Sequence, residues 1–208
     1  MTIYTMPQRS EEWFAVRMGK FTANEFGILM PSTRQKPEDW NDTQMKIILR
    51  VAAERITGQP VDPGFTSKPM QWGIDHEDEA RAAFEMATGL HVDQVGFVEA
   101  DDWCGCSPDG LIPTDGGIEL KCPNQDTHLR YLMDSQNLID DYDWQCQGSM
   151  LFTGRGHWFL CSFDPRFPIK HQLVAVQIKR DEEKITKLDK RLDAAIDKAK
   201  EVINGIQE

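Results

Sequence analysis

Two carboxylates and an amine occur close together between residues 107 and 121, where they could act on a phosphate ester. A Ser-Pro-Asp-Gly turn contains Asp109, a Gly-Gly turn follows at 116–117, and the next segment alternates apolar and polar residues. In a strand, residues two apart share a face, so Glu119 and Lys121 would project to one side while their apolar neighbours enter the core. A short hairpin would then bring Asp109 beside Glu119.

This set of side chains suits a hard divalent cation with an adjacent basic or electrostatic group. Mg²⁺ takes oxygen ligands, usually one or two carboxylates together with waters and substrate phosphates, and Mn²⁺ can substitute for it. Such an ion would polarise a phosphoryl oxygen and acidify the attacking water. A lowered pKa beside the ion would let Lys121 position or deprotonate that water. The alternative is a surface hairpin that carries an ordinary Glu–Lys pair.

Composition is that of a soluble globular protein, with 208 residues of which 40% are hydrophobic and 27% charged. This length predicts a single domain over residues 1–208 with ample core. No apolar run approaches a membrane span, and the first nine residues lack the apolar region of a signal peptide, so we expect a cytoplasmic protein with no membrane partner. Five cysteines without a CxxC pair are typical of free thiols in a reducing compartment.

The net charge of −11 argues against a protein that binds nucleic acid diffusely, because such proteins are normally basic. It does not exclude an enzyme that gathers its positive charge in one groove while its outer face is acidic.

Periodicity and capping signals place these residues on helices and strands. We expect helices over 10–18, 22–30, 41–56, 71–88, 125–138, 140–153 and 181–206, with a long surface loop over 59–70. We expect strands over 91–99, 103–106 and 117–122 in a central mixed sheet of three or four strands, and two further strands over 157–163 and 171–179.

Two further charged residues lie at positions that need an explanation. Glu77 falls on the apolar stripe of the 71–88 helix, where a carboxylate must be paired or bind metal. A pair with Arg81, four residues later, is the structural alternative. Arg17 precedes a helix N-terminus, and both features favour phosphate, although the side chain could instead be solvated beside Trp13.

The 140–153 helix carries Tyr142 and Gln145 three residues apart, and therefore on one face. Packing of Tyr142 in the core is the alternative.

Five motifs appear in a fixed order and together resemble the phage lambda exonuclease family. This family is the YqaJ-like viral recombinase and alkaline exonuclease branch of the PD-(D/E)XK nucleases. The motifs are the segment from Trp13 to Ala23, the Trp72-Gly73 to Glu85 helix, Cys-Ser-Pro-Asp-Gly-Leu at 106–111, Glu-Leu-Lys-Cys-Pro at 119–123, and the Tyr142/Gln145 pair.

The resemblance implies an α/β fold with a restriction-endonuclease-like core, in which helices flank a central mixed β-sheet and a long helix ends the chain. It implies a metal-dependent exonuclease that degrades one strand of linear double-stranded DNA 5′ to 3′, releasing 5′-mononucleotides. The remaining 3′ strand would serve recombination by single-strand annealing. A ring-shaped homotrimer and a single-strand annealing recombinase as partner are also implied. The alternatives are a restriction-like or junction-cleaving endonuclease, and a DNA-end-binding protein without cleavage.

The resemblance also implies a role for each matching residue. The metal ligands would be Asp109, Glu119 and the Leu120 carbonyl, with Glu77 serving a second ion. Lys121 and Gln145 would act beside the scissile phosphate, next to Tyr142. The 5′-phosphate would meet Arg17, Ser107, Gln145 and Asn24, the last at a position where the family usually has serine. Lys68 and Met70 would reach the duplex end, where Met70 separates the terminal base pair, unless it only fills a gap in the core.

Overall fold

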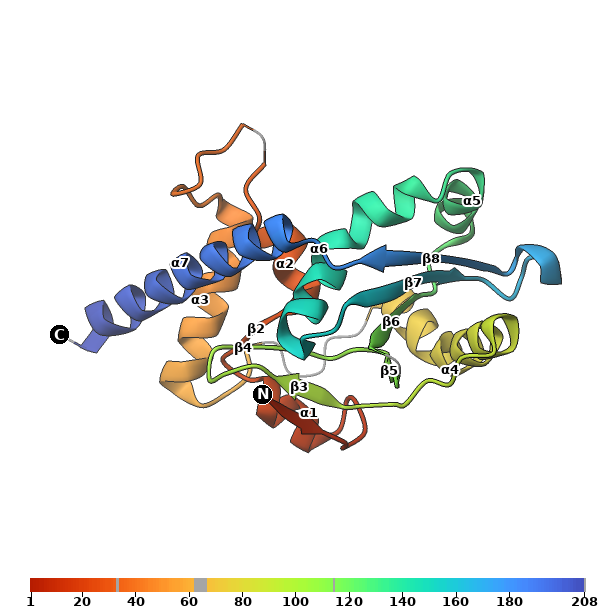
Figure 1. Ribbon diagram of the computed structural model, residues 1–208. Helices are drawn as coiled ribbons and strands as arrows, with labels where there is room; N and C mark the ends of the chain where they lie inside the picture. The colour runs from red at the N-terminus through yellow and green to blue at the C-terminus, as the bar shows by residue number, and fades with distance from the viewer. Residues whose placement is uncertain (33, 62–66, 114, 208) are drawn as a thin grey trace.

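A computed structural model of the chain describes residues 1–32, 34–61, 67–113 and 115–207 (Figure 1). In chain order the elements are β1 (Thr2–Tyr4), α1 (Glu11–Arg17), β2 (Phe21–Thr22), a 3₁₀ turn (Ala23–Glu25), α2 (Phe26–Leu29), α3 (Asp42–Thr57), α4 (Lys68–Thr88), β3 (Phe97–Glu99), β4 (Cys104–Cys106), β5 (Gly110–Ile112), β6 (Gly116–Lys121), α5 (Gln125–Met133), α6 (Gln136–Thr153), β7 (His157–Phe163), a second 3₁₀ turn (Ile169–His171), β8 (Leu173–Lys179) and α7 (Glu182–Gln207).

The described strands form two four-stranded mixed sheets, in the orders β1-β3-β4-β2 and β5-β6-β7-β8. The expected grouping of 91–99, 103–106 and 117–122 in one sheet is therefore wrong. The antiparallel pair β3–β4 acquires β1 as a neighbour on one side and, in parallel, β2 on the other. Among the residues that the structure describes, one isolated bridge, between Asp93 and Leu111, pairs the 91–99 segment with the second sheet. Pairings across such long sequence separations leave no local signal.

Helices cover both faces of the second sheet, with α4 on one face and α5 and α6 on the other (Figure 1). The alternation of β6 separates the two cores. One core contains Ile118 and Leu120 of β6 with Ala80 and Phe84 of α4. The other lies between the sheet and the helices α5 and α6, and contains Tyr131, Leu138, Cys146, Met150, Trp158, Leu160 and Ile178.

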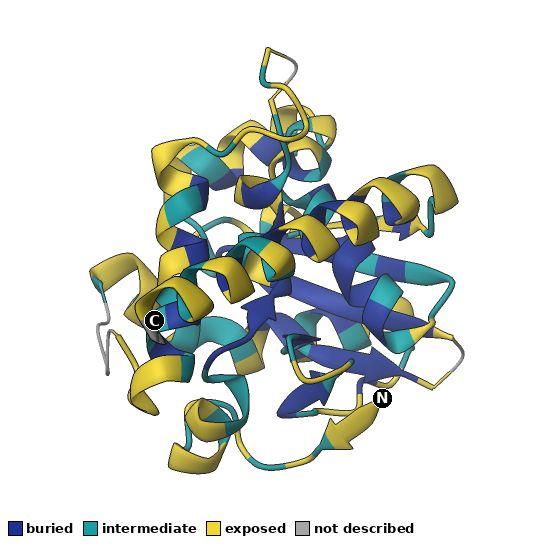
Figure 2. Ribbon diagram, turned by 90° about the vertical axis from the view of Figure 1, so that its left-hand side faces the viewer, coloured by how far each residue is buried: buried dark blue, intermediate teal, exposed yellow. Residues whose placement is uncertain are grey.

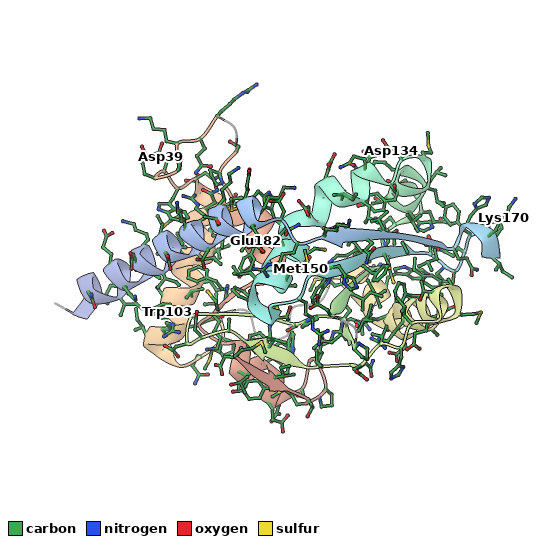
Figure 3. All side chains as sticks on the ribbon, viewed as in Figure 1. Asp39, Trp103, Asp134, Met150, Lys170 and Glu182 are labelled. Carbon is green, nitrogen blue, oxygen red and sulfur yellow. The ribbon has the colours of Figure 1, made fainter. Side chains whose placement is uncertain are left out.

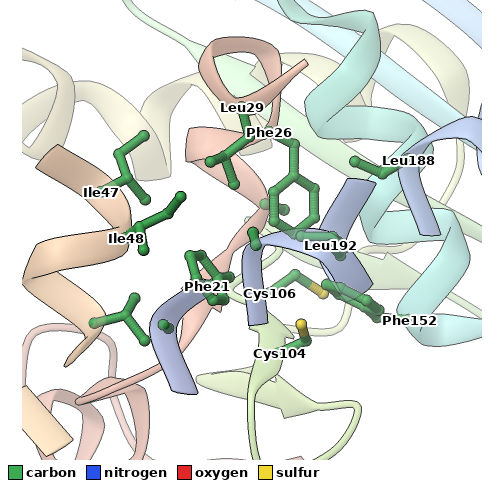
Figure 4. Packing of buried hydrophobic residues seen from close by; sticks show 14 of the residues in the cluster. Phe21, Phe26, Leu29, Ile47, Ile48, Cys104, Cys106, Phe152, Leu188 and Leu192 are labelled. Carbon is green, nitrogen blue, oxygen red and sulfur yellow. The ribbon is translucent and has the colours of Figure 1, made fainter. Parts of the chain in front are cut away.

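A third core joins the first sheet to the helices around α7. Phe21, Phe26 and Ile48 pack there against Leu188 and Leu192 of α7 (Figure 4). Figure 2 shows the result, with buried strands inside and helices whose outer surfaces are exposed. The long C-terminal helix therefore packs within this chain through its apolar stripe. None of the helices in the described part of the chain combines the length and apolar composition that a membrane span requires.

Most helix ends follow the local signals. Asn41 caps α3, and glycines in the left-handed conformation end α3, α4 and α6 at Gly58, Gly89 and Gly154. Several boundaries differ from expectation. The strand expected over 91–99 covers only Phe97–Glu99, and the helix expected over 22–30 is a 3₁₀ turn followed by the short α2. Helix α4 begins at Lys68 because Ser67 caps it and Pro69 is tolerated in the first turn. The break between α5 and α6 falls at residues 134–135 instead of 139.

Candidate active site

The β5–β6 hairpin brings the two acidic residues together as the sequence predicts. Its register pairs Gly110 with Ile118, and one further step sets Asp109 opposite Glu119. Strand β5 starts at Gly110, so this edge of β6 has no strand partner beyond Ile118. The Leu120 N–H on that edge donates instead to Asp109 Oδ2 at 2.6 Å. Asp109 is thereby fixed against the strand that carries Glu119.

Glu119 and Lys121 project from β6 toward α6. Lys121 Nζ lies 2.6 Å from Glu119 Oε1 and donates to Gln145 Oε1 at 3.1 Å. Gln145 Nε2 donates to the same Glu119 oxygen at 2.7 Å. The Lys121 ammonium also lies 4.5 Å from the centre of the Tyr142 ring, a cation–π contact. The structure therefore joins four of the predicted site residues. Tyr142 is half-buried and lies against both Lys121 and the core beneath α6, so its packing alternative is also present.

The pKa values of this cluster reflect burial and crowded negative charge. Burial raises the pKa of Asp109 well above its ordinary value, and the carboxylates of Glu119 and Glu77 raise it further. Burial alone would lower the pKa of Lys121, but Glu119 and Asp109 outweigh it and the pKa is raised. The lowered pKa expected for Lys121 concerns the metal-bound site and stays a prediction; without metal, its two carboxylate neighbours stabilise the ammonium.

Glu77 lies on the opposite side of β6, on α4, and both of its oxygens are in ion pairs. Oε1 pairs with Arg81 at 2.9 Å, and Oε2 pairs with Arg9 at 2.9 Å. Glu77, Arg81, Arg9 and Asp109 all line one cavity of about 400 Å³. The Glu77–Arg81 pair that the sequence allowed is present. The role of Glu77 as a ligand for a second ion stays a prediction.

Arg17 is held in a polar niche beside the same strand region. Its guanidinium donates to Ser107 Oγ at 2.6 Å and packs 4.1 Å from the centre of the Trp13 ring. Trp13 Nε1 also donates to Ser107 Oγ, at 3.1 Å. Burial lowers the pKa of Arg17 to about 10, against the opposing effect of Glu25, so the group remains a cation at neutral pH. Arg17 and Ser107, two residues before Asp109, thus meet as predicted.

Asn24 is linked to Arg17 through Thr22, whose Oγ1 accepts a hydrogen bond from Arg17 Nη2 at 3.5 Å. It is exposed, its Oδ1 accepts a hydrogen bond from Thr22 Oγ1 at 2.7 Å, and it lines a cavity of about 230 Å³ with Tyr142 and Gln145.

Lys68 and Met70 lie in the first turn of α4, not in a loop. Both are exposed, and the 51% exposure of Met70 argues against a role as core filler. Residues 62–66 of the expected loop lie outside the described residues. The positions of Lys68 and Met70 are compatible with contact to a duplex end, which stays a prediction.

The donor set fits a divalent cation. Glu119 is only 4% exposed, and its Oε2 has no hydrogen-bond partner among the residues that the structure describes. A buried carboxylate oxygen without a partner is costly unless a cation or water satisfies it. No three acidic, histidine or cysteine side chains of the described residues converge on one point. Asp109, Glu119 and the Leu120 carbonyl are oxygen donors of the kind that Mg²⁺ takes, with waters completing its coordination.

Arg9 is the main site residue that sequence reasoning missed. It has no motif, and only the fold brings the N-terminal segment across to α4, a sequence separation of 68 residues. Trp13 was recognised only as a neighbour, although it positions both Arg17 and Ser107. The one available signal was the aromatic residue four positions before Arg17, on the same face of a helix.

Comparison with known proteins places this geometry in context. The sequence model of the YqaJ-like viral recombinase domain family matches residues 12–156 of this chain. An alkaline exonuclease, LHK-Exo from Laribacter hongkongensis, has a TM-score of 0.85 and 30% identity over 95% of this chain and 96% of that chain. Its complex with dAMP gives a TM-score of 0.84 at 30% identity, with the same coverage of both chains.

A phage related exonuclease from Haemophilus somnus 129PT shares the fold, with a TM-score of 0.75 at 18% identity over 90% of this chain and 96% of that chain. The search of curated proteins found no match. The fold is that of the alkaline exonucleases. The chain belongs to the YqaJ-like viral recombinase domain family.

Proposed function

We propose that this protein is a Mg²⁺-dependent exonuclease that degrades one strand of linear double-stranded DNA from its 5′ end. The class itself, a phage-type exonuclease that acts on DNA, follows from the family match and from the shared alkaline exonuclease fold. The metal, the polarity and the mononucleotide product are the parts that we add. The observation that carries the proposal is the meeting of Asp109, Glu119 and Lys121 at an unpaired strand edge, with a partnerless oxygen on Glu119.

Asp109, Glu119 and the Leu120 carbonyl would hold the ion, with Mn²⁺ able to substitute. When bound, it would supply Lewis-acid polarisation of the phosphoryl group and acidify the attacking water. The raised pKa of Asp109 supports this assignment, because a buried carboxylate that also faces Glu119 and Glu77 gains from a neighbouring cation.

The chain's own residues orient the reacting groups. Lys121 is a cation, held by Glu119 and Gln145, and stabilises the negative charge that develops on the phosphate. Gln145 fixes the rotamer of Glu119 and presents its amide beside the scissile bond. Tyr142 covers the Lys121 ammonium and keeps it directed into the site.

The 5′-to-3′ direction rests on Arg17. An enzyme that removes one nucleotide at a time from the 5′ end creates a new 5′-phosphate with each cut. The Arg17–Ser107 pair offers a fork donor and a hydroxyl close to Asp109, which suits that phosphate. Binding there would set the next phosphodiester at the carboxylates and would yield 5′-mononucleotides.

The proposal extends to the setting in which the enzyme works. Family resemblance supports one nuclease domain over the whole chain, a ring-shaped homotrimer, and a single-strand annealing recombinase that receives the 3′ strand, in the cytoplasm. Light scattering on the purified protein would test the trimer, and a monomer or dimer at working concentrations would contradict it.

A digest of linear and circular duplex DNA tests the central proposal. We expect Mg²⁺-dependent loss of the linear form with release of 5′-mononucleotides, while the closed circle persists. Opening of the circle would instead identify an endonuclease. Binding to DNA ends without cleavage of either form would identify an end-binding protein. The Glu119→Gln variant is the matched control for contaminating nuclease.

A further inference from the structure

Arg9 has a backbone conformation that an arginine rarely adopts. Its φ is 70°, in the left-handed region, and among the described non-glycine residues only Asp115 shares this feature. The chain on either side is anchored. Gln8 Nε2 donates to the carbonyls of Val95 at 3.1 Å and Pro108 at 2.9 Å, and Ser10 caps α1. The segment thus holds Arg9 at a fixed point beside the site, because the adjacent Gln8 is bonded to Pro108, the residue before Asp109.

The two arginines that pair with Glu77 differ in how replaceable they are. Arg81 lies on the same helix as Glu77, its side chain is 9% exposed, and it also pairs with Asp78 at 2.6 Å. The Arg9 side chain is 41% exposed, and its one ion pair among the described residues is with Glu77. An exposed pair contributes little and exchanges readily. Arg9 is therefore the partner that a competing cation would displace.

We propose that Arg9 pairs with Glu77 in the resting protein and moves to a phosphate of the scissile strand when a divalent ion binds. The inference rests on the proposed function, extended by the second ion predicted at Glu77, and adds a residue and an exchange to it. It predicts that metal binding and DNA binding are coupled through one side chain.

The charges around the cavity support this exchange. Glu77, Asp78 and Asp109 line it together with Arg9 and Arg81, so the resting protein has more negative than positive side chains there. A divalent ion at Glu77 would repel the Arg9 guanidinium and replace it as the partner of Glu77 Oε2. Because Gln8 and Ser10 fix the backbone, only the exposed side chain has to move. The cavity of about 400 Å³ leaves room for that movement, and an arginine fork suits a phosphate.

Two variants remove the guanidinium in different ways. Arg9→Gly keeps the segment folded because glycine adopts a φ of 70° without strain. Arg9→Gln keeps a side chain of similar length without the charge. Lys170→Gln is the matched control, since this exposed cation lies at the outer end of the β7–β8 hairpin (Figure 3).

The first measurement is calorimetric titration of DNA-free protein with MnCl₂ or MgCl₂. Both Arg9 variants should bind the ion up to about fivefold more tightly than wild type, because the competing cation is gone. Lys170→Gln should leave the affinity unchanged.

The second measurement is the affinity for a 5′-phosphorylated duplex with phosphorothioate linkages at its ends to slow cleavage. In EDTA the Arg9 variants should match wild type, because Arg9 is then held by Glu77. With Mg²⁺ at the same ionic strength they should bind about tenfold more weakly, through loss of a charge-assisted contact. A merely structural role of Arg9 would not strengthen metal binding while weakening DNA binding.

Unchanged or weaker metal binding by both variants, or an equal loss of DNA affinity with and without Mg²⁺, would overturn the exchange. These outcomes differ from failure of the proposed function. In that case wild-type protein would bind no divalent ion, or would leave linear DNA intact in Mg²⁺.

Discussion

Replacement of Arg17 by alanine is expected to abolish the enzyme's preference for 5′-phosphorylated ends. In the DNA-free protein the guanidinium is already fixed by Ser107 and by the face of Trp13, so a phosphate would meet a preformed donor. Little side-chain ordering opposes the contact. A hydrogen bond between charged partners contributes about 1.5–3 kcal/mol, which is about tenfold to a hundredfold in rate.

The assay compares digestion of duplexes that differ only in a 5′-phosphate or 5′-hydroxyl, at fixed salt because other phosphate contacts are salt-sensitive. Wild type should digest the phosphorylated end faster by the factor above, and Arg17→Ala should treat both ends alike. Arg17→Lys should keep part of the preference, because the lysine ammonium supplies a point charge but not the two-pronged hydrogen bonding of a guanidinium. Lys187→Ala, on an exposed position of α7, is the control for a change in net charge.

The pH dependence follows from the same residue. Burial lowers the pKa of Arg17 to about 10, so the cation is complete at neutral pH and is lost as the pH rises through that value. The preference should therefore be flat near neutrality and should decline as the pH approaches about 10. Equal digestion of both ends by wild type, or full preference in Arg17→Ala, would refute the pocket.

Three further predictions concern the carboxylates, the lysine and the packing of α6. Asp109→Asn should abolish cleavage and raise the melting temperature of metal-free protein at neutral pH. Because the pKa of Asp109 is raised in the folded protein, its ionisation destabilises the fold as the pH rises, and the gain in melting temperature should vanish in acid. Scanning fluorimetry in EDTA at several pH values would measure this gain. A variant that is less stable than wild type at neutral pH would contradict the prediction. Lys121→Met should slow single turnover by about 10²–10³-fold while DNA affinity in gel shifts stays the same; normal turnover would reduce the Glu–Lys contact to a surface pair. Gly148→Ala would place a methyl group 2.2 Å from a ring carbon of Phe26 and should destabilise the protein by about 1–3 kcal/mol in urea unfolding. Gly205 lies in α7 with open space around it, so Gly205→Ala should stabilise the protein by about 0.5–1 kcal/mol. If both substitutions changed the stability in the same direction, the packing argument would be wrong.

Local chemistry explains which parts of the fold could be predicted. The capping box at Thr22 and Glu25, the cap at Asn41 and the glycine at position 58 each act within one turn of chain, so their helix ends are predictable. The start of α4 was missed because Pro69 suggests a loop, whereas a proline in the first turn costs no hydrogen bond. The division of the strands into two sheets depends on partners far apart in sequence.

The same distinction applies to the site. Asp109, Glu119 and Lys121 were predictable as a group because one hairpin and one alternation position them. Arg9 was not, because its contact to Glu77 exists only after the N-terminal segment crosses to α4. The raised pKa of Lys121 likewise needs the folded arrangement, since two buried carboxylates must lie near one ammonium before their effect exceeds that of burial.

Strand β6 separates the site into two halves that rest on different cores. Glu77 depends on the packing of Phe84 and its neighbours under α4, whereas Lys121 and Gln145 depend on the core beneath α6. The two halves can therefore be loosened separately. A small shift of α4 would misplace Glu77 and Arg81 while Lys121, Gln145 and the Arg17 niche kept their geometry. Core substitutions far from the site would therefore act on one side of it alone. They would alter binding of the second ion predicted at Glu77 without changing the proposed contact between Arg17 and the 5′-phosphate.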